Sequence, residues 1–162
     1  MKDKINFLAR FLALTLVLFL IWVPLGEKYL LLLAWVSKYV LWVMGYHVTL
    51  VTDGSPSFLY HGAMIGMKDA HLANFNIIPL IALILATPRI EPVRRMKMLV
   101  IGLFLIFCMH VTDFVSHFPV YFHGSGIAET VMIFMAVGEV AVPFVLWFVL
   151  AHKEILESVR QP

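Results

Sequence analysis

The chain has 162 residues, of which 62% are hydrophobic and only 14% are charged, and its mean hydropathy is +0.93. Soluble domains carry roughly 25% charged residues, so this composition indicates an integral membrane protein. The formal net charge of +2 comes without a basic, aromatic-rich patch, and nothing in the sequence points to nucleic acid. A single cysteine, Cys108, excludes an internal disulfide framework and a CxxC metal or redox motif.

Five apolar segments are expected to form helices, because a membrane-spanning helix needs roughly 20 mainly apolar residues. They are residues 6–23, 29–46, 72–87, 98–117 and 127–151. The first segment follows the positive start MKDKINFLAR and has no small-residue cleavage site, so it reads as a retained anchor. We therefore expect an all-α, polytopic membrane helix bundle that forms a single integral membrane domain over residues 1–162.

Residues 47–71, between the second and third segments, form the only sizeable stretch expected outside the membrane. The sequence HVTLVTDG alternates apolar and polar residues and then reaches Asp53–Gly54, a pair typical of tight turns. This pattern predicts a small β-hairpin in the outer loop.

Basic residues in the connector 88–97 predict the orientation of the chain, since cytoplasmic connectors are enriched in Lys and Arg. The connector contains Arg89, Arg94, Arg95 and Lys97. This places the C-terminus in the cytoplasm and the loop 47–71 outside. Lys2, Lys4 and Arg10 favour a cytoplasmic N-terminus, which fits four spans with residues 29–46 as an embedded or interfacial helix on the outer side. Five spans, with residues 29–46 crossing, are the alternative.

Polar side chains collect in the outer half of the apolar segments. At about 1.5 Å per residue, His110 and Asp113 lie about 20 and 24 Å outward from Lys97. The same rise puts Glu139 about 18 Å from the inner end of its segment. His110, Asp113 and His117 follow at i, i+3 and i+7, so they share one helix face. The candidate site consists of His71, His110, Asp113, His117 and Glu139.

These residues also have structural interpretations. His110 and Asp113 can satisfy each other near a helix end, and His117 can be interfacial. Simple interfacial anchoring is the preferred interpretation for the outer histidines His47, His61 and His123. Glu139 differs, because a carboxylate at membrane depth is costly and usually faces a partner or a cavity. Pro143, four residues later, is expected to kink the helix and free the Glu139 carbonyl.

Three segments follow one another in the middle of the chain: LLLAWVSKYVLWVMGYHVTLVTDG, then AHLANFNIIPLIALILATP, then RRMKMLVIGLFLIF. In this order they resemble the core of the exosortase/archaeosortase family, and the resemblance covers residues 29–151. It implies a multi-spanning membrane fold of the kind that processes C-terminal sorting signals on the outer side of the membrane.

The chain departs from the family pattern at two positions. Where members have a catalytic cysteine in an A-C-[ST]-G pattern, this chain has AHLA with His71. Where they have an arginine near the outer end of the next helix, it has HVTDF with Asp113. A later family histidine matches His123, whereas Cys108 lies in the wrong helix to replace the nucleophile. The resemblance therefore implies a sortase-like scaffold without the usual thioester chemistry.

The expected function is a non-peptidase, sortase-like membrane subunit or scaffold with no assigned catalytic residues and a polar site that binds a metal. Imidazole and carboxylate ligands suit copper, zinc or iron. One alternative is a metal- or haem-binding subunit of a membrane oxidoreductase, with a b-type haem between His71 and His110. The other is an active transpeptidase, which the replaced cysteine and arginine oppose. Expected partners are membrane lipid and either another membrane protein or a second copy of the chain.

Overall fold

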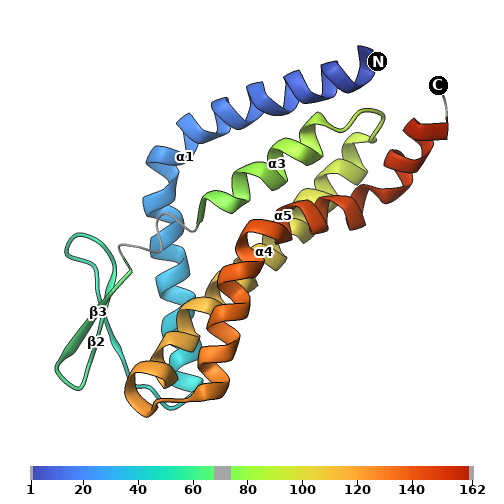
Figure 1. Cartoon of the computed structure of the whole chain (residues 1–162). Helices are drawn as coiled ribbons and strands as arrows, with labels where there is room; N and C mark the ends of the chain where they lie inside the picture. Colours follow the sequence, from blue (N-terminus) through green and yellow to red (C-terminus); the bar gives the residue numbers. More distant parts are fainter. Residues whose placement is uncertain (1, 68–73, 161–162) are drawn as a thin grey trace. The chain divides into compact units, whose positions relative to one another are not determined.

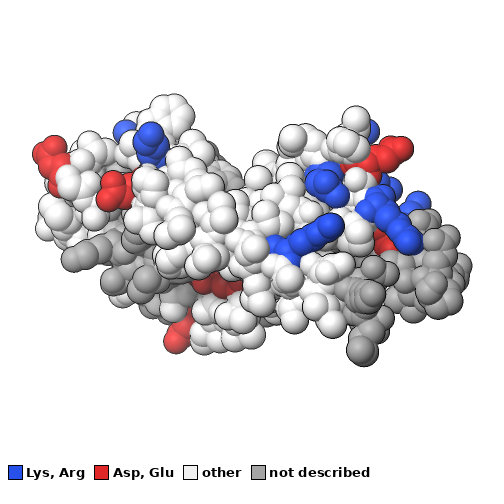
Figure 2. Space-filling view, turned by 90° about the horizontal axis from the view of Figure 1, so that it is seen from above, with Lys and Arg blue, Asp and Glu red and all other residues white. Residues whose placement is uncertain are grey.

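The computed structural model describes residues 2–67 and 74–160 and shows a mainly helical chain with one small sheet (Figure 1). Its α-helices in these residues are α1 (Lys2–Val43), α3 (Ile77–Ala86), α4 (Pro92–His123) and α5 (Gly126–Arg160). Three stretches are long and apolar enough to cross a membrane, namely Ile5–Val43, Pro92–His123 and Gly126–Leu156. Most of the described surface in Figure 2 carries no charged side chain. The predicted helical class with a small β-loop is confirmed, and the three long apolar helices agree with a membrane protein.

The first two apolar segments form one continuous helix. Helix α1 has 42 residues and includes Pro24, although its sequence reads as two segments separated by residues 24–28. The polar interruption in α1 is short, and Glu27 and Lys28 are good helix formers, so the helix continues through it. A helix of this length measures about 63 Å, twice the roughly 30 Å hydrocarbon core of a bilayer. Helix α1 therefore has about twice the number of residues that a single crossing requires.

The chain divides into two compact units, which are described separately. Unit 1 consists of Met1–Trp22, Phe75–Ile106 and Glu139–Pro162, and unit 2 consists of Val23–Asn74 and Phe107–Gly138. Each long helix contributes its residues to both units.

Helices in unit 1 pack closely where a glycine allows it. A Cβ placed on Gly102 of α4 would lie 2.8 Å from Leu80 Cδ2 of α3 and 3.6 Å from Leu150 Cδ1 of α5. Leu80 is fully buried. Small residues let membrane helices approach in this way, because van der Waals packing is a main source of their association.

Thr87 ties the end of α3 to α4 and α5. Its hydroxyl donates to the Leu83 carbonyl (2.6 Å) and accepts from Trp147 Nε1 (2.8 Å). Its own carbonyl accepts from Arg95 Nη2 at 3.1 Å. Beside it, Arg94 forms an ion pair with Glu154 of α5. The connector after α3 is therefore held by polar contacts from both neighbouring helices.

Replacing Thr87 with valine is expected to lower the free energy of unfolding by about 1–3 kcal/mol. Valine keeps the shape of the side chain but leaves the Trp147 indole N–H without its acceptor. The change is measured by denaturant titration in mixed micelles. Thr130→Val is the matched control, because the exposed Thr130 hydroxyl bonds only to a carbonyl of its own helix. Equal losses in the two variants would contradict a special role for Thr87.

Unit 2 contains the sheet. Strands β1 (Thr49–Val51), β2 (Ser57–Tyr60) and β3 (Ala63–Gly66) pair antiparallel in the order β1-β2-β3. The predicted hairpin at Asp53–Gly54 is confirmed, with Gly54 at φ 93° between β1 and β2. A second hairpin was not predicted; it turns at His61 (φ 48°) and Gly62 (φ 82°), as in a type I′ turn.

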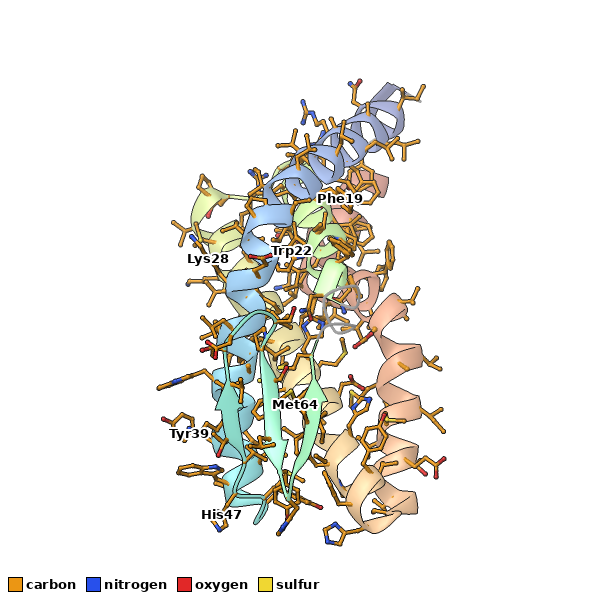
Figure 3. The ribbon with its side chains drawn as sticks, turned by 90° about the vertical axis from the view of Figure 1, so that its left-hand side faces the viewer. Phe19, Trp22, Lys28, Tyr39, His47 and Met64 are labelled. Atoms are coloured by element: carbon orange, nitrogen blue, oxygen red, sulfur yellow. The ribbon has the colours of Figure 1, made fainter. Side chains whose placement is uncertain are left out.

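The register of the sheet separates a buried face from an exposed one. Leu50, Phe58 and Ile65 lie opposite one another and face the core. Leu59 and Met64 form the neighbouring pair on the other face, and Met64 is 66% exposed (Figure 3).

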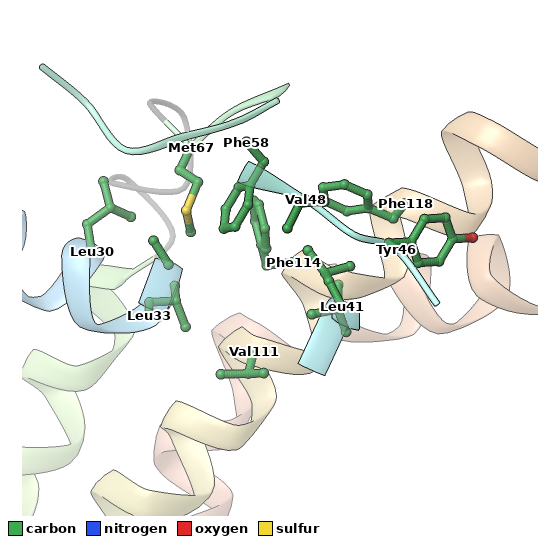
Figure 4. Close-up of a cluster of buried hydrophobic side chains, with 12 residues drawn as sticks. Leu30, Leu33, Leu41, Tyr46, Val48, Phe58, Met67, Val111, Phe114 and Phe118 are labelled. Carbon is green, nitrogen blue, oxygen red and sulfur yellow. The ribbon is translucent and has the colours of Figure 1, made fainter. Parts of the chain in front are cut away.

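An aromatic cluster joins this sheet to α1 and α4 (Figure 4). Phe58 of β2 is fully buried, with its ring centroid 5.1 Å from that of Phe114 and 6.0 Å from that of Phe118. Leu33 and Leu41 of α1 complete the cluster from the helix side. The sheet is therefore anchored through one residue of its central strand to two successive turns of α4.

Candidate functional site

The best-defined polar contact of unit 2 joins His110 of α4 to Tyr29 of α1. Nδ1 of His110 lies 2.7 Å from the Tyr29 hydroxyl oxygen, and the two rings meet edge to face. His110 is 3% exposed because it lies on the buried face of α4, next to Val111. Its other ring nitrogen, Nε2, is buried and has no hydrogen-bond partner in the described part of the chain. His110 is therefore a buried imidazole held at one nitrogen and unsatisfied at the other.

Asp113 and His117 lie one and two turns further along α4. Both are half-buried, so the predicted three-residue face exists as a buried His110 with two partly exposed neighbours. Nδ1–H of His117 donates to the backbone carbonyl of Asp113 at 2.9 Å. This bond turns one imidazole nitrogen towards its own helix and leaves Nε2 for any other contact.

Glu139 belongs to unit 1, whereas the α4 residues of the candidate site belong to unit 2. It is half-buried on α5. Its backbone carbonyl accepts a long hydrogen bond, 3.5 Å, from Nδ2 of Asn76. Pro143 lies inside α5 and has no N–H to offer this carbonyl, so Asn76 supplies a donor where the sequence predicts a freed acceptor.

The fifth candidate, His71, lies outside the described residues. Within residues 2–67 and 74–160, no group of three or more His, Cys, Asp or Glu side chains is placed to hold a metal ion. The predicted metal site thus stays a prediction, for which the structure supplies His110 as one well-defined potential ligand.

A second tyrosine–histidine contact lies further along unit 2. The Tyr46 hydroxyl oxygen lies 2.8 Å from Nδ1 of His123, within hydrogen-bond distance. Burial, and then the neighbouring Tyr60, raises the pKa of the Tyr46 hydroxyl above its usual value. His123 thus has a specific partner, whereas His47 and His61 are exposed beside aromatic rings.

Neither tyrosine was among the predicted site residues. Tyr29 follows Glu27–Lys28 at the point where α1 becomes apolar again, and it stands four residues before the buried Leu33. That helical spacing could have marked it as a core-facing polar residue. No sequence pattern, however, pairs it with a histidine 81 positions away.

No protein-family model, curated protein or solved structure matches this chain.

Proposed function

We propose that α1, α4 and α5 cross the membrane, that α3 forms a shorter fourth pass, and that both termini lie in the cytoplasm. The distribution of charge supports this orientation. Unit 1 holds nine of the twelve Lys and Arg residues of the chain, including Arg89 after α3 and Arg94, Arg95 and Lys97 in the first turns of α4. Because cytoplasmic segments are enriched in these residues, the basic end of unit 1 is the cytoplasmic end.

With this membrane topology, the chain is a non-peptidase subunit or scaffold with a sortase-like fold. The sequence supports this function, because His71 and Asp113 stand where the resembled family has its cysteine and arginine. The position of Cys108 agrees with it. Cys108 is exposed and His110 is buried, so the thiol lies on another side of α4 from the one buried imidazole of that helix.

Metal binding is the second candidate function, and one observation favours it. A buried nitrogen without a partner costs about 1–3 kcal/mol, so His110 Nε2 is expected to meet a ligand in the working protein. If Nδ1–H donates to the Tyr29 oxygen, Nε2 carries the lone pair that a metal requires, which is the usual arrangement around metal-binding histidines.

Within unit 2, Asp113 and His117 are the further ligands of this proposal, and His71 and Glu139 are candidates from the sequence alone. Copper, zinc and iron all accept such nitrogen and oxygen donors. Because the described residues contain no ready group of three ligands, completion of the site requires His71, a rearrangement of these side chains, or a ligand from a partner chain.

Metal analysis tests the two functions together. The protein is purified in mild detergent without chelators, and its metal content is measured by inductively coupled plasma mass spectrometry. Metal binding predicts near-stoichiometric copper, zinc or iron that is lost in His110→Ala. It also predicts retention in His152→Ala, since His152 is exposed and bonds to a backbone carbonyl of α5. Metal at background level in the wild type would exclude metal binding, and only the scaffold function would remain. A Soret band in the absorption spectrum would identify haem.

A further inference from the structure

The second half of α1 carries a row of exposed aromatic side chains. Trp35, Tyr39 and Trp42 follow at i, i+4 and i+7 and are 56%, 46% and 43% exposed. Their rings contact one another edge to face, with centroids 4.9 Å apart for the first pair and 6.1 Å for the second. Lys38 Nζ lies 5.0 Å from the centroid of the Trp42 ring. Figure 3 shows Tyr39 projecting away from the ribbon. These four residues are called the aromatic row.

Helix α1 cannot be rotated about its axis to bury the aromatic row. Leu33, Ser37 and Leu41 are at most 1% exposed and belong to the side of α1 that packs inside unit 2. Rotating the helix to bury the aromatic row would expose these residues and break the contact between Tyr29 and His110. The aromatic row therefore faces the surroundings of the protein.

Exposed residues change in character along α1. In the first half they are mainly aliphatic, as at Leu8, Leu12, Leu16 and Leu20, and suit lipid acyl chains. Exposed Glu27 and Lys28 follow, then exposed Leu31 and Leu32, and then the aromatic row, so aromatic side chains join the aliphatic ones only in the second half. From Ile5 to Val23 the helix rises about 28 Å, close to the roughly 30 Å thickness of a hydrocarbon core. One half of α1 is thus sufficient to cross the core.

We infer that the aromatic row lies in the headgroup region of the membrane, with the phospholipid interface as its partner. Trp and Tyr concentrate at that depth because their rings are apolar and their N–H or O–H groups are polar. Lys38 adds a positive charge beside Trp42, which complements the phosphates of the headgroups. On this basis residues 29–43 are the interfacial part of α1, and residues 5–23 are its spanning part. The inference depends on the membrane fold and is independent of metal binding at His110.

Depth-dependent fluorescence quenching tests this inference. One variant keeps Trp42 (Trp22→Phe, Trp35→Phe), and a second keeps Trp35 (Trp22→Phe, Trp42→Phe). Both retain Trp147, whose indole bonds to Thr87 in unit 1. A third variant with Trp147 alone supplies the background to subtract. Each is reconstituted in phosphatidylcholine vesicles with a nitroxide on the headgroup, near the top of the acyl chain, or at the chain end. Circular dichroism confirms that each variant is helical.

The expected result is strongest quenching of Trp42 by the headgroup nitroxide and of Trp35 by the headgroup or upper-chain nitroxide. Both should be quenched several-fold more than by the chain-end nitroxide. Strongest quenching by the chain-end nitroxide would overturn the inference, because residues 29–43 would then cross the hydrocarbon core. Lack of quenching from every lipid position would also overturn it, since the aromatic row would then face water or another protein.

Discussion

Replacing Phe58 with alanine is expected to lower the free energy of unfolding by about 3–5 kcal/mol. Phe58 is fully buried, and its ring joins the central strand to Phe114 and Phe118 of α4. Alanine would leave a cavity between the sheet and two helical turns. Strands β1 and β3 both pair with β2, so loss of the ring should loosen the whole sheet from α4.

Unfolding is measured in mixed micelles. Near-ultraviolet circular dichroism monitors the aromatic cluster, and far-ultraviolet circular dichroism monitors the helices. Leu59→Ala is the matched control, because Leu59 follows Phe58 on the same strand but points to the exposed face. It should change stability by less than about 1 kcal/mol. Similar losses for both variants would mean that the sheet does not depend on this anchor.

Replacing Gly102 with leucine is expected to destabilise unit 1 by about 3 kcal/mol, the second large effect. Even a Cβ at this position would lie 2.8 Å from Leu80 Cδ2, and the remaining atoms of leucine require still more room. Leu80 is fully buried and cannot move aside without displacing its own neighbours. The better helix propensity of leucine offsets this loss by about 1 kcal/mol at most.

Gly126→Leu is the control for this prediction. Gly126 begins α5 and has no atom within 4 Å of the position that a Cβ would occupy. Both variants gain the same side chain, so the difference in their midpoints of unfolding isolates the packing of α4 against α3 and α5. A Gly102 variant as stable as the Gly126 variant would show that the helices separate at little cost.

Local patterns predicted much of the fold. The apolar segments at 98–117 and 127–151 lie within α4 and α5, and Asp53–Gly54 lies in the turn between β1 and β2. The turn at His61–Gly62 was missed because histidine is a less common residue at positive φ than Asn or Asp. The continuity of α1 was missed because Pro24 and the charges after it are typical of a helix boundary.

Prediction of the candidate site was less complete. His110 was singled out because it shares one helix face with Asp113 and His117 in an otherwise apolar segment, and the structure buries it within unit 2. Pro143 indicated a freed carbonyl at Glu139, and Asn76 supplies the donor. The partner of His110 could not be predicted, because Tyr29 lies 81 positions earlier and nothing local distinguishes it from an interfacial tyrosine.

The sequence by itself determined the class of the protein, the places where helices form, and the first hairpin. These features depend on composition, on the length of apolar runs and on turn residues, all of which act over a few neighbouring positions. Only the tertiary structure decided which side of α1 and α4 is buried and that the Leu80 side chain packs against Gly102. It alone also showed that two histidines on α4 each have a tyrosine partner. Those contacts join residues far apart in the chain, and they are selected by packing and by the need of buried polar groups for partners.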